Sequence, residues 1–105
     1  MKGWTGKILQ IDLTDFTTKV ITLSADVYYK YIGGKGLAGY FLRPLIHHSW
    51  DSPEMPLLFF TGPLVGTPSP TSGRMAISSR SPLTGTVGDT SVGGKLGTQL
   101  KNAGW

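Results

Sequence analysis

The segment Gly62-Pro-Leu-Val-Gly-Thr-Pro-Ser-Pro-Thr-Ser-Gly-Arg74 guides the prediction of this fold. Its glycines and prolines predict a long loop, because both residue types favour turns over regular structure. Apolar and polar residues then alternate over Arg74–Ser79, which predicts a strand that leaves the loop. We therefore expect the guanidinium of Arg74 to face the loop. Glycine backbone that a ligand can approach closely, beside a cationic fork, predicts a cradle for a phosphorylated ligand.

A second glycine-rich stretch extends this predicted cradle. Gly93-Gly94-Lys95 opens the segment Gly93–Ala103, in which apolar residues recur at helical spacing and Lys95 falls in the first turn. Free amides at a helix start attract anions, as does a nearby ammonium group. We therefore predict that Gly93, Gly94 and Lys95 join Arg74 in holding the ligand. A plain helix start with two permissive glycines is the alternative that the sequence leaves open.

The residues before the loop predict a hairpin and a short helix. Alternating residues in Trp4–Leu13 and Lys19–Leu23 predict two paired strands. A helix is expected over about Ala25–Tyr31, with Ser24 as its N-cap and Gly33-Gly34 at its end.

Two further elements are expected before the loop. A second helical period begins near Leu37 and should end or kink near Arg43, because Pro44 lacks the backbone donor and clashes with the preceding turn. The apolar run Leu57–Phe60 is typical of a strand covered on both faces, and we predict a central strand there.

Composition narrows the class of ligand and the compartment. The chain has 105 residues, a formal net charge of +4 and no cysteine. The charge favours anionic ligands, and because the ten Lys and Arg residues form no cluster, small phosphorylated molecules fit better than nucleic acid. Without cysteine, these residues cannot form disulfides or thiolate-bound metal and iron–sulfur sites. Since there is neither a signal-peptide core nor an apolar run of about 18 residues, we expect a cytoplasmic protein without membrane contact.

Two glycine patterns approach nucleotide-binding motifs. Gly34-Lys-Gly-Leu-Ala-Gly39 fits the dinucleotide pattern, but Pro44 shortens the crossover helix that this motif requires, so a helix-to-helix turn with closely packed glycines is favoured. Asp89-Thr-Ser-Val-Gly-Gly-Lys-Leu96 approaches the P-loop pattern, but Asp89 replaces its first glycine and Leu96 replaces the magnesium-binding Ser or Thr. Kinase or NTPase activity is therefore not expected.

Seven short blocks occur in order along nearly the whole chain. They are Trp4-Thr-Gly-Lys-Ile-Leu-Gln-Ile-Asp-Leu13, Ile32-Gly-Gly-Lys-Gly-Leu-Ala38, Thr61-Gly-Pro-Leu-Val-Gly-Thr67, Ser72-Gly-Arg74, Ser81-Pro-Leu-Thr-Gly85, Gly93-Gly94 and Leu100-Lys-Asn-Ala-Gly104. Together they resemble the N-terminal domain of the tungsten-containing aldehyde ferredoxin oxidoreductases. The resemblance implies an α+β fold with antiparallel or mixed β-sheets and short helices. It also implies that residues 1–105 are an N-terminal pterin-cofactor-binding domain, or part of one.

The family's function gives expectations for the whole enzyme. Such enzymes oxidise aldehydes to carboxylic acids at a tungsten, or molybdenum, bis-pterin centre. Electrons then pass through a four-iron, four-sulfur cluster, carried by later domains, to ferredoxin or a similar acceptor. The resemblance therefore implies the remaining domains of the same enzyme as partners and an inactive chain when these residues stand alone, and it leaves homo-oligomer formation open.

The resemblance also assigns residues to the cofactor. Arg74 matches the family arginine that binds the pterin, and Gly93 matches a glycine whose backbone lies against it. Ser91 stands where the family has an asparagine that contributes to the cofactor and its bridging magnesium, so only a backbone contact is expected there. Gly94 and Lys95 are added from the helix-start argument. No catalytic residue and no side-chain metal ligand is expected in this chain.

Two other classes of function remain open from the residues. One is a free-standing module that binds phosphate or a nucleotide, and the other is a non-catalytic assembly domain. Binding of a phosphorylated ligand by the isolated chain would favour the first, and self-association through exposed apolar sheet edges would favour the second.

Overall fold

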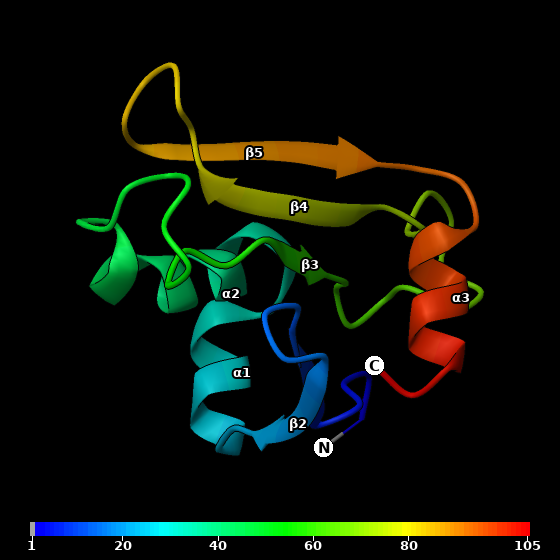
Figure 1. Ribbon diagram of the computed structural model, residues 1–105. Helices are drawn as coiled ribbons and strands as arrows, with labels where there is room; N and C mark the ends of the chain where they lie inside the picture. Colours follow the sequence, from blue (N-terminus) through cyan, green and yellow to red (C-terminus); the bar gives the residue numbers. More distant parts are fainter. Residues whose placement is uncertain (1) are drawn as a thin grey trace.

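The computed structural model describes residues 2–105. Within these residues, two antiparallel sheets and three short α-helices confirm the predicted α+β class (Figure 1). The elements in chain order are β1 (Lys7–Asp12), β2 (Thr17–Thr22), α1 (Ala25–Tyr31), α2 (Gly34–Leu42), the 3₁₀ helix η1 (Arg43–Leu45), β3 (Leu58–Phe60), β4 (Met75–Arg80), β5 (Val87–Val92) and α3 (Leu96–Asn102).

The N-terminal hairpin forms as its alternating pattern predicts. β1 and β2 pair antiparallel, with Leu9 opposite Val20, and the tight turn between them begins where Asp12 Oδ1 accepts a hydrogen bond of 2.9 Å from the backbone N–H of Thr14. Ile8, on the face opposite to Leu9, packs against the core cluster that α1, α2 and β3 form. The start of β1 lies beside Trp105, because the Lys7 ammonium is 4.7 Å from the centroid of the Trp105 ring.

The hairpin turn also contains a pH-dependent contact. Asp15 Oδ1 accepts hydrogen bonds from Thr17 Oγ1 (2.7 Å) and from the Thr17 backbone N–H (3.2 Å), and these lower the pKa of Asp15 below its ordinary value of 3.8. The contact therefore stabilises the fold above the unfolded pKa, and this stabilisation is lost as the pH falls through the lower, folded pKa. We expect an NMR titration to place the Asp15 midpoint below 3.8 and Thr17→Val to raise it. An Asp15 midpoint that Thr17→Val leaves unchanged would contradict this account.

The C-terminal end of α1 is capped by a different residue from the one predicted. Ser24 is its N-cap residue, as expected, but makes no side-chain capping bond. At the other end, the C-cap residue is Ile32 (φ 68°), which precedes the two glycines, so the predicted glycine C-cap is wrong. Gly34, which also has a positive φ (49°), begins α2 instead. Ile32 is held there because its N–H donates to Tyr28 O (2.8 Å) and its carbonyl accepts a bond from Trp4 Nε1.

α2 confirms the prediction at Pro44. The α-helix ends at Leu42, and Pro44 lies in the tighter η1 turn that follows.

Among residues 2–105, neither α2 nor any other helix has the length and apolar character needed to span a bilayer.

The second sheet differs from the prediction in two ways. Its strand order is β3-β4-β5, so β4 is central and the predicted central strand Leu57–Phe60 is an edge strand. Phe59 on this strand is 46% exposed, because the described residues cover only the opposite face of β3. β5 was not predicted at all: Val87–Val92 is rich in small and polar residues, and it is paired along all six residues with β4. The strand therefore forms through its pairing with β4, because its residues have little intrinsic β-propensity that a sequence analysis could detect.

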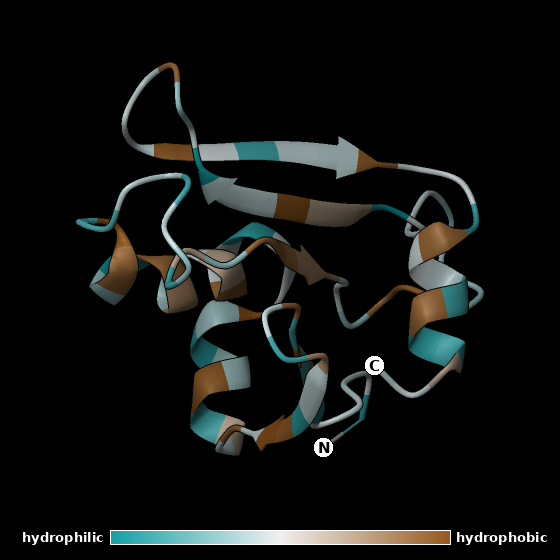
Figure 2. Cartoon of the chain, in the orientation of Figure 1, coloured by the Kyte–Doolittle hydropathy of each residue, from teal (hydrophilic) through white to brown (hydrophobic). Residues whose placement is uncertain are grey.

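The core lies between α2 and one face of this sheet. Leu37 and Ala38 of α2 pack with Phe60 of β3 and Tyr28 of α1, and all four are buried. Leu42 is fully buried. Figure 2 shows hydrophobic residues continuing along β3, and several large apolar side chains remain exposed, including Leu57 and Leu83. The small buried core is therefore accompanied by much uncovered apolar surface, which is a feature of protein interaction sites.

Candidate functional site

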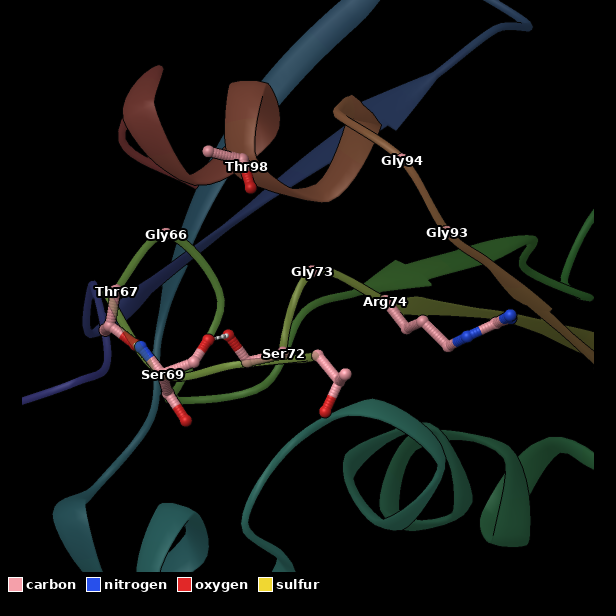
Figure 3. Close-up of a pocket in the computed structure, with 10 residues that line it drawn as sticks. Gly66, Thr67, Ser69, Ser72, Gly73, Arg74, Gly93, Gly94 and Thr98 are labelled. Atoms are coloured by element: carbon pink, nitrogen blue, oxygen red, sulfur yellow. Dashed lines mark hydrogen bonds between the residues drawn. The ribbon is translucent and has the colours of Figure 1, made fainter.

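A pocket of about 620 Å³ lies between the long loop and the start of α3 (Figure 3). Both glycine-rich stretches singled out from the sequence contribute to it, because β4 carries the chain away from the first and β5 brings it back at the second. The lining residues are Gly66, Thr67, Ser69, Thr71, Ser72, Gly73, Arg74, Gly93, Gly94 and Thr98.

Hydrogen bonds within the loop define its wall of the pocket. Thr67 Oγ1 donates to Leu64 O (2.6 Å) and accepts from the backbone N–H of Ser69 (3.3 Å). Ser72 Oγ donates to Ser69 O (2.8 Å), which closes the turn before the strand (Figure 3). The hydroxyl and backbone groups of the loop thus form a polar wall without a negative side chain among the lining residues.

α3 packs closely against the same loop at a glycine. A Cβ atom at Gly97 would lie 3.2 Å from Gly73 O, 3.4 Å from Met75 Cβ and 3.5 Å from Val65 Cγ1. Gly97 is buried, so no open space could receive a larger side chain. The absence of a side chain at this position lets α3 come near enough to complete the pocket wall.

Arg74, the residue immediately before β4, lines the pocket. Its Nη1 donates to Ser91 Oγ on β5 (3.3 Å), and a Cβ atom at Gly93 would lie 3.8 Å from its Cζ. The prediction that its guanidinium faces the loop is wrong, because the side chain points away from the Ser69–Ser72 turn and runs toward β5 (Figure 3). The side chain is exposed, and its single hydrogen bond to protein leaves most of its donors for a ligand.

Of the other predicted site residues, some line the pocket and some lie outside its lining. Gly93 and Gly94 line it, and Gly94 has a φ of 80°, a conformation that favours glycine. Ser91 does not line the pocket but adjoins it through its bond to Arg74. Lys95 is outside the lining and is the N-cap of α3, which begins at Leu96 rather than at Gly93 as predicted.

A further charged pair lies near Ser91. Lys35 Nζ, in the first turn of α2, is 2.7 Å from Asp89 Oδ2, and Asp89 is two residues before Ser91 on β5. Residues two apart on a strand share a face, so Lys35 reaches the same face of β5 as Arg74. Two cations and one carboxylate on this face give it a net positive charge, which suits an anionic ligand.

The structure also shows whether the two glycine patterns are nucleotide-binding motifs. Gly34–Gly39 follows α1 and not a strand, so the dinucleotide motif is absent, but the segment is the first part of α2 rather than a turn between helices. The predicted close packing holds for Gly36, which lies against Tyr31 O, and not for Gly39. Asp89–Leu96 is mostly the strand β5 and its exit, not a loop that cradles phosphate. Within residues 2–105, no three His, Cys, Asp or Glu side chains are grouped so as to hold a metal ion.

Thr98 and Lys101 of α3 were not predicted to contribute to this region. Thr98 lines the pocket, and the Lys101 ammonium donates to two carbonyls of the long loop. The apolar spacing in α3 indicated only which face is covered, and Thr98 stands outside that spacing. A long-range contact of a lysine with backbone carbonyls has no local sequence signal.

Comparisons with known proteins agree with the observed fold. The family model for the aldehyde ferredoxin oxidoreductase N-terminal domain matches residues 8–105. The tungsten-containing aldehyde ferredoxin oxidoreductases of Pyrococcus abyssi and Pyrococcus horikoshii are 44% and 43% identical over 107 residues, covering 100% of this chain. A solved structure, the active site complex BamBC of benzoyl coenzyme A reductase with 1,5 dienoyl-CoA, matches with a TM-score of 0.94 and 30% identity over 99% of this chain.

The chain therefore belongs to the aldehyde ferredoxin oxidoreductase family and corresponds to its N-terminal domain. It spans 18% of the length of these two Pyrococcus relatives and 16% of the matched chain in the solved structure. Most of the length of these relatives is thus absent from the sequence described here.

Proposed function

We propose that this chain forms part of the binding surface for a tungsten, or molybdenum, bis-pterin in a longer oxidoreductase. The observation that carries the proposal is the meeting of Arg74, Ser91 and Gly93 beside a polar pocket walled by glycine backbone. A pterin phosphate is a compact anion, and an arginine fork with several free donors, beside backbone that a ligand can approach, fits it. The family membership supports the tungsten of this centre, since tungsten stands in the names of the relatives.

Each residue has a proposed role in holding the cofactor. Arg74 would bind the phosphate through its exposed donors, and its bond to Ser91 would orient the guanidinium. The bare backbone of Gly93 and Gly94 would let the ligand come close, because any Cβ at Gly93 would enter the space beside the guanidinium. Lys95 would contribute only long-range attraction, and a magnesium contact is proposed at the Ser91 backbone. When bound, the metal centre would supply the redox chemistry, while these residues bind and orient the cofactor.

The remainder of the proposed function belongs to a longer polypeptide. The reaction is the oxidation of an aldehyde to a carboxylic acid, with electrons passed to ferredoxin through an iron–sulfur cluster. Because these 105 residues contain no cysteine, that cluster would be held by other domains of the enzyme. The proposed partners are therefore those domains, the electron acceptor and the aldehyde, in the cytoplasm.

A chimeric enzyme tests this function. We expect these 105 residues to replace the matched segment of the Pyrococcus abyssi relative and the resulting chimera to retain the cofactor. Tungsten would be measured by elemental mass spectrometry, and pterin by the fluorescence of its oxidised product, both against the unmodified relative. A folded chimera that contains neither tungsten nor pterin would overturn the proposal. Pterin and tungsten without aldehyde oxidation would support the binding role alone, because the rest of the chimera comes from the relative.

A further inference from the structure

Lys101 makes an unusual contact between α3 and the start of the long loop. Its Nζ donates to Gly62 O (3.0 Å) and to Pro63 O (2.9 Å), which are 39 and 38 residues away in the sequence. The side chain is half-buried, and the resulting loss of hydration lowers the pKa of Lys101. The two carbonyls therefore replace water that the ammonium has lost on burial.

The carbonyls that accept these bonds belong to the turn that begins the pocket wall. Gly62 O also accepts the backbone N–H of Val65 (3.3 Å), so the same atom connects this turn to the Lys101 ammonium. Three residues beyond Pro63, a Cβ atom at Gly66 would lie 3.9 Å from Asn102 Oδ1 and 4.0 Å from Lys101 Cδ. The aliphatic stem of Lys101 thus approaches one part of the loop while its head group binds another.

α3 consequently holds the loop at two separated places. Gly97, at its N-terminal half, packs against Gly73 at the end of the loop. Lys101, one turn later, binds Gly62 and Pro63 at the beginning of the loop. The lining residues from Gly66 to Ser72 lie between these two attachment points in the sequence. Thr98, which lies on α3 between Gly97 and Lys101, forms the facing wall.

We propose that Lys101 is a positioning residue for the cofactor site, fixing the beginning of the loop so that its polar wall keeps its distance from Thr98 and Gly94. The inference rests on the proposed function only for the identity of the ligand. A lysine at the end of a helix can also act by its charge on the helix dipole. That role does not require the two loop carbonyls, which are the groups that the ammonium contacts.

The variant Lys101→Met separates these roles, because methionine keeps an unbranched apolar stem and loses all three donors. We expect amide hydrogen exchange in the loop over residues 62–67 of the chimera to rise about tenfold, since bonds from a charged donor are lost. Exchange in β4 should stay unchanged. Pterin and tungsten should dissociate faster on dialysis. Lys19→Met, on the exposed hairpin, removes the same charge and should leave loop exchange and cofactor retention unchanged.

Three results would overturn the inference. One is unchanged loop exchange in Lys101→Met, and another is faster exchange spread equally over β4 and the loop, which would indicate general destabilisation. If Lys101→Met does not fold, Lys101→Arg tests the inference instead. Arginine can donate to both carbonyls, so this variant should retain the protection of the loop from exchange. Loss of that protection in folded Lys101→Arg would be the third result against the inference. A wild-type chimera without pterin would reject the proposed function, while loop exchange would still test the role of Lys101.

Discussion

Replacing Gly36 with alanine is expected to lower the free energy of unfolding by about 3 kcal/mol, at the upper end of the usual cost of overpacking. A Cβ atom at this position would lie 2.3 Å from Tyr31 O and 3.3 Å from the Tyr31 carbonyl carbon. Both atoms are backbone at the end of α1, so relief of the clash would require α1 and α2 to move apart. Tyr31 O also accepts the Gly33 N–H (2.8 Å), and this movement would strain the same connection.

Gly39→Ala is the matched control in the same helix. A Cβ atom there meets nothing within 4 Å, and its backbone is helical. Alanine is a better helix former than glycine, so this variant should be as stable as the wild type or more stable by up to about 1 kcal/mol. Denaturant unfolding of the two variants and the wild type measures their free energies of unfolding. Equal stability of Gly36→Ala and Gly39→Ala would show that close packing does not explain Gly36.

These two glycines show what a sequence pattern can and cannot decide. Gly34, Gly36 and Gly39 match a dinucleotide-binding pattern, yet Gly36 serves helix packing and Gly39 faces open space. The spacing alone carries no information about which backbone lies opposite each glycine. Pro44 did carry such information, because its missing donor acts locally, and α2 ends before it as predicted.

The same distinction explains which strands could be predicted. β1 and β2 alternate in sequence and are joined by a short turn, so local signals were sufficient. The position of β3 at the sheet edge depends on which strands pair with β4. The apolar run Leu57–Phe60 contains no information about that pairing. β5 has polar residues on both faces and a glycine, and it forms through its six pairings with β4.

The candidate site was predictable in part for the same reason. The two glycine-rich stretches and Arg74 were identified from residue chemistry, and β4–β5 pairing does bring them together. The direction of the Arg74 side chain was missed, because it depends on Ser91 as a partner across two strands. Lys101 was missed because its acceptors are backbone carbonyls, which any sequence provides.

Arg74→Ala should cause the largest loss of function among the changes considered for the longer enzyme. A phosphate would lose a charge-assisted, two-pronged contact, and bonds to charged groups contribute about 1.5–3 kcal/mol each. We therefore expect retained pterin and tungsten to fall at least about tenfold in the chimera under limiting cofactor. The fold should survive, since Arg74 is exposed and makes one hydrogen bond to the protein.

Two variants make the Arg74 result specific. Arg74→Lys keeps the charge but loses the planar fork, so it should retain an intermediate amount of cofactor if geometry matters as well as charge. Arg43→Ala removes an exposed arginine of η1 that does not line the pocket, and it should leave occupancy unchanged. Full pterin and tungsten occupancy in Arg74→Ala would remove Arg74 from the site. Equal losses in Arg74→Ala and Arg43→Ala would mean that net charge attracts the cofactor. A loss confined to Arg74 would instead indicate that the cofactor needs the guanidinium, which is bonded to Ser91 and lies beside Gly93.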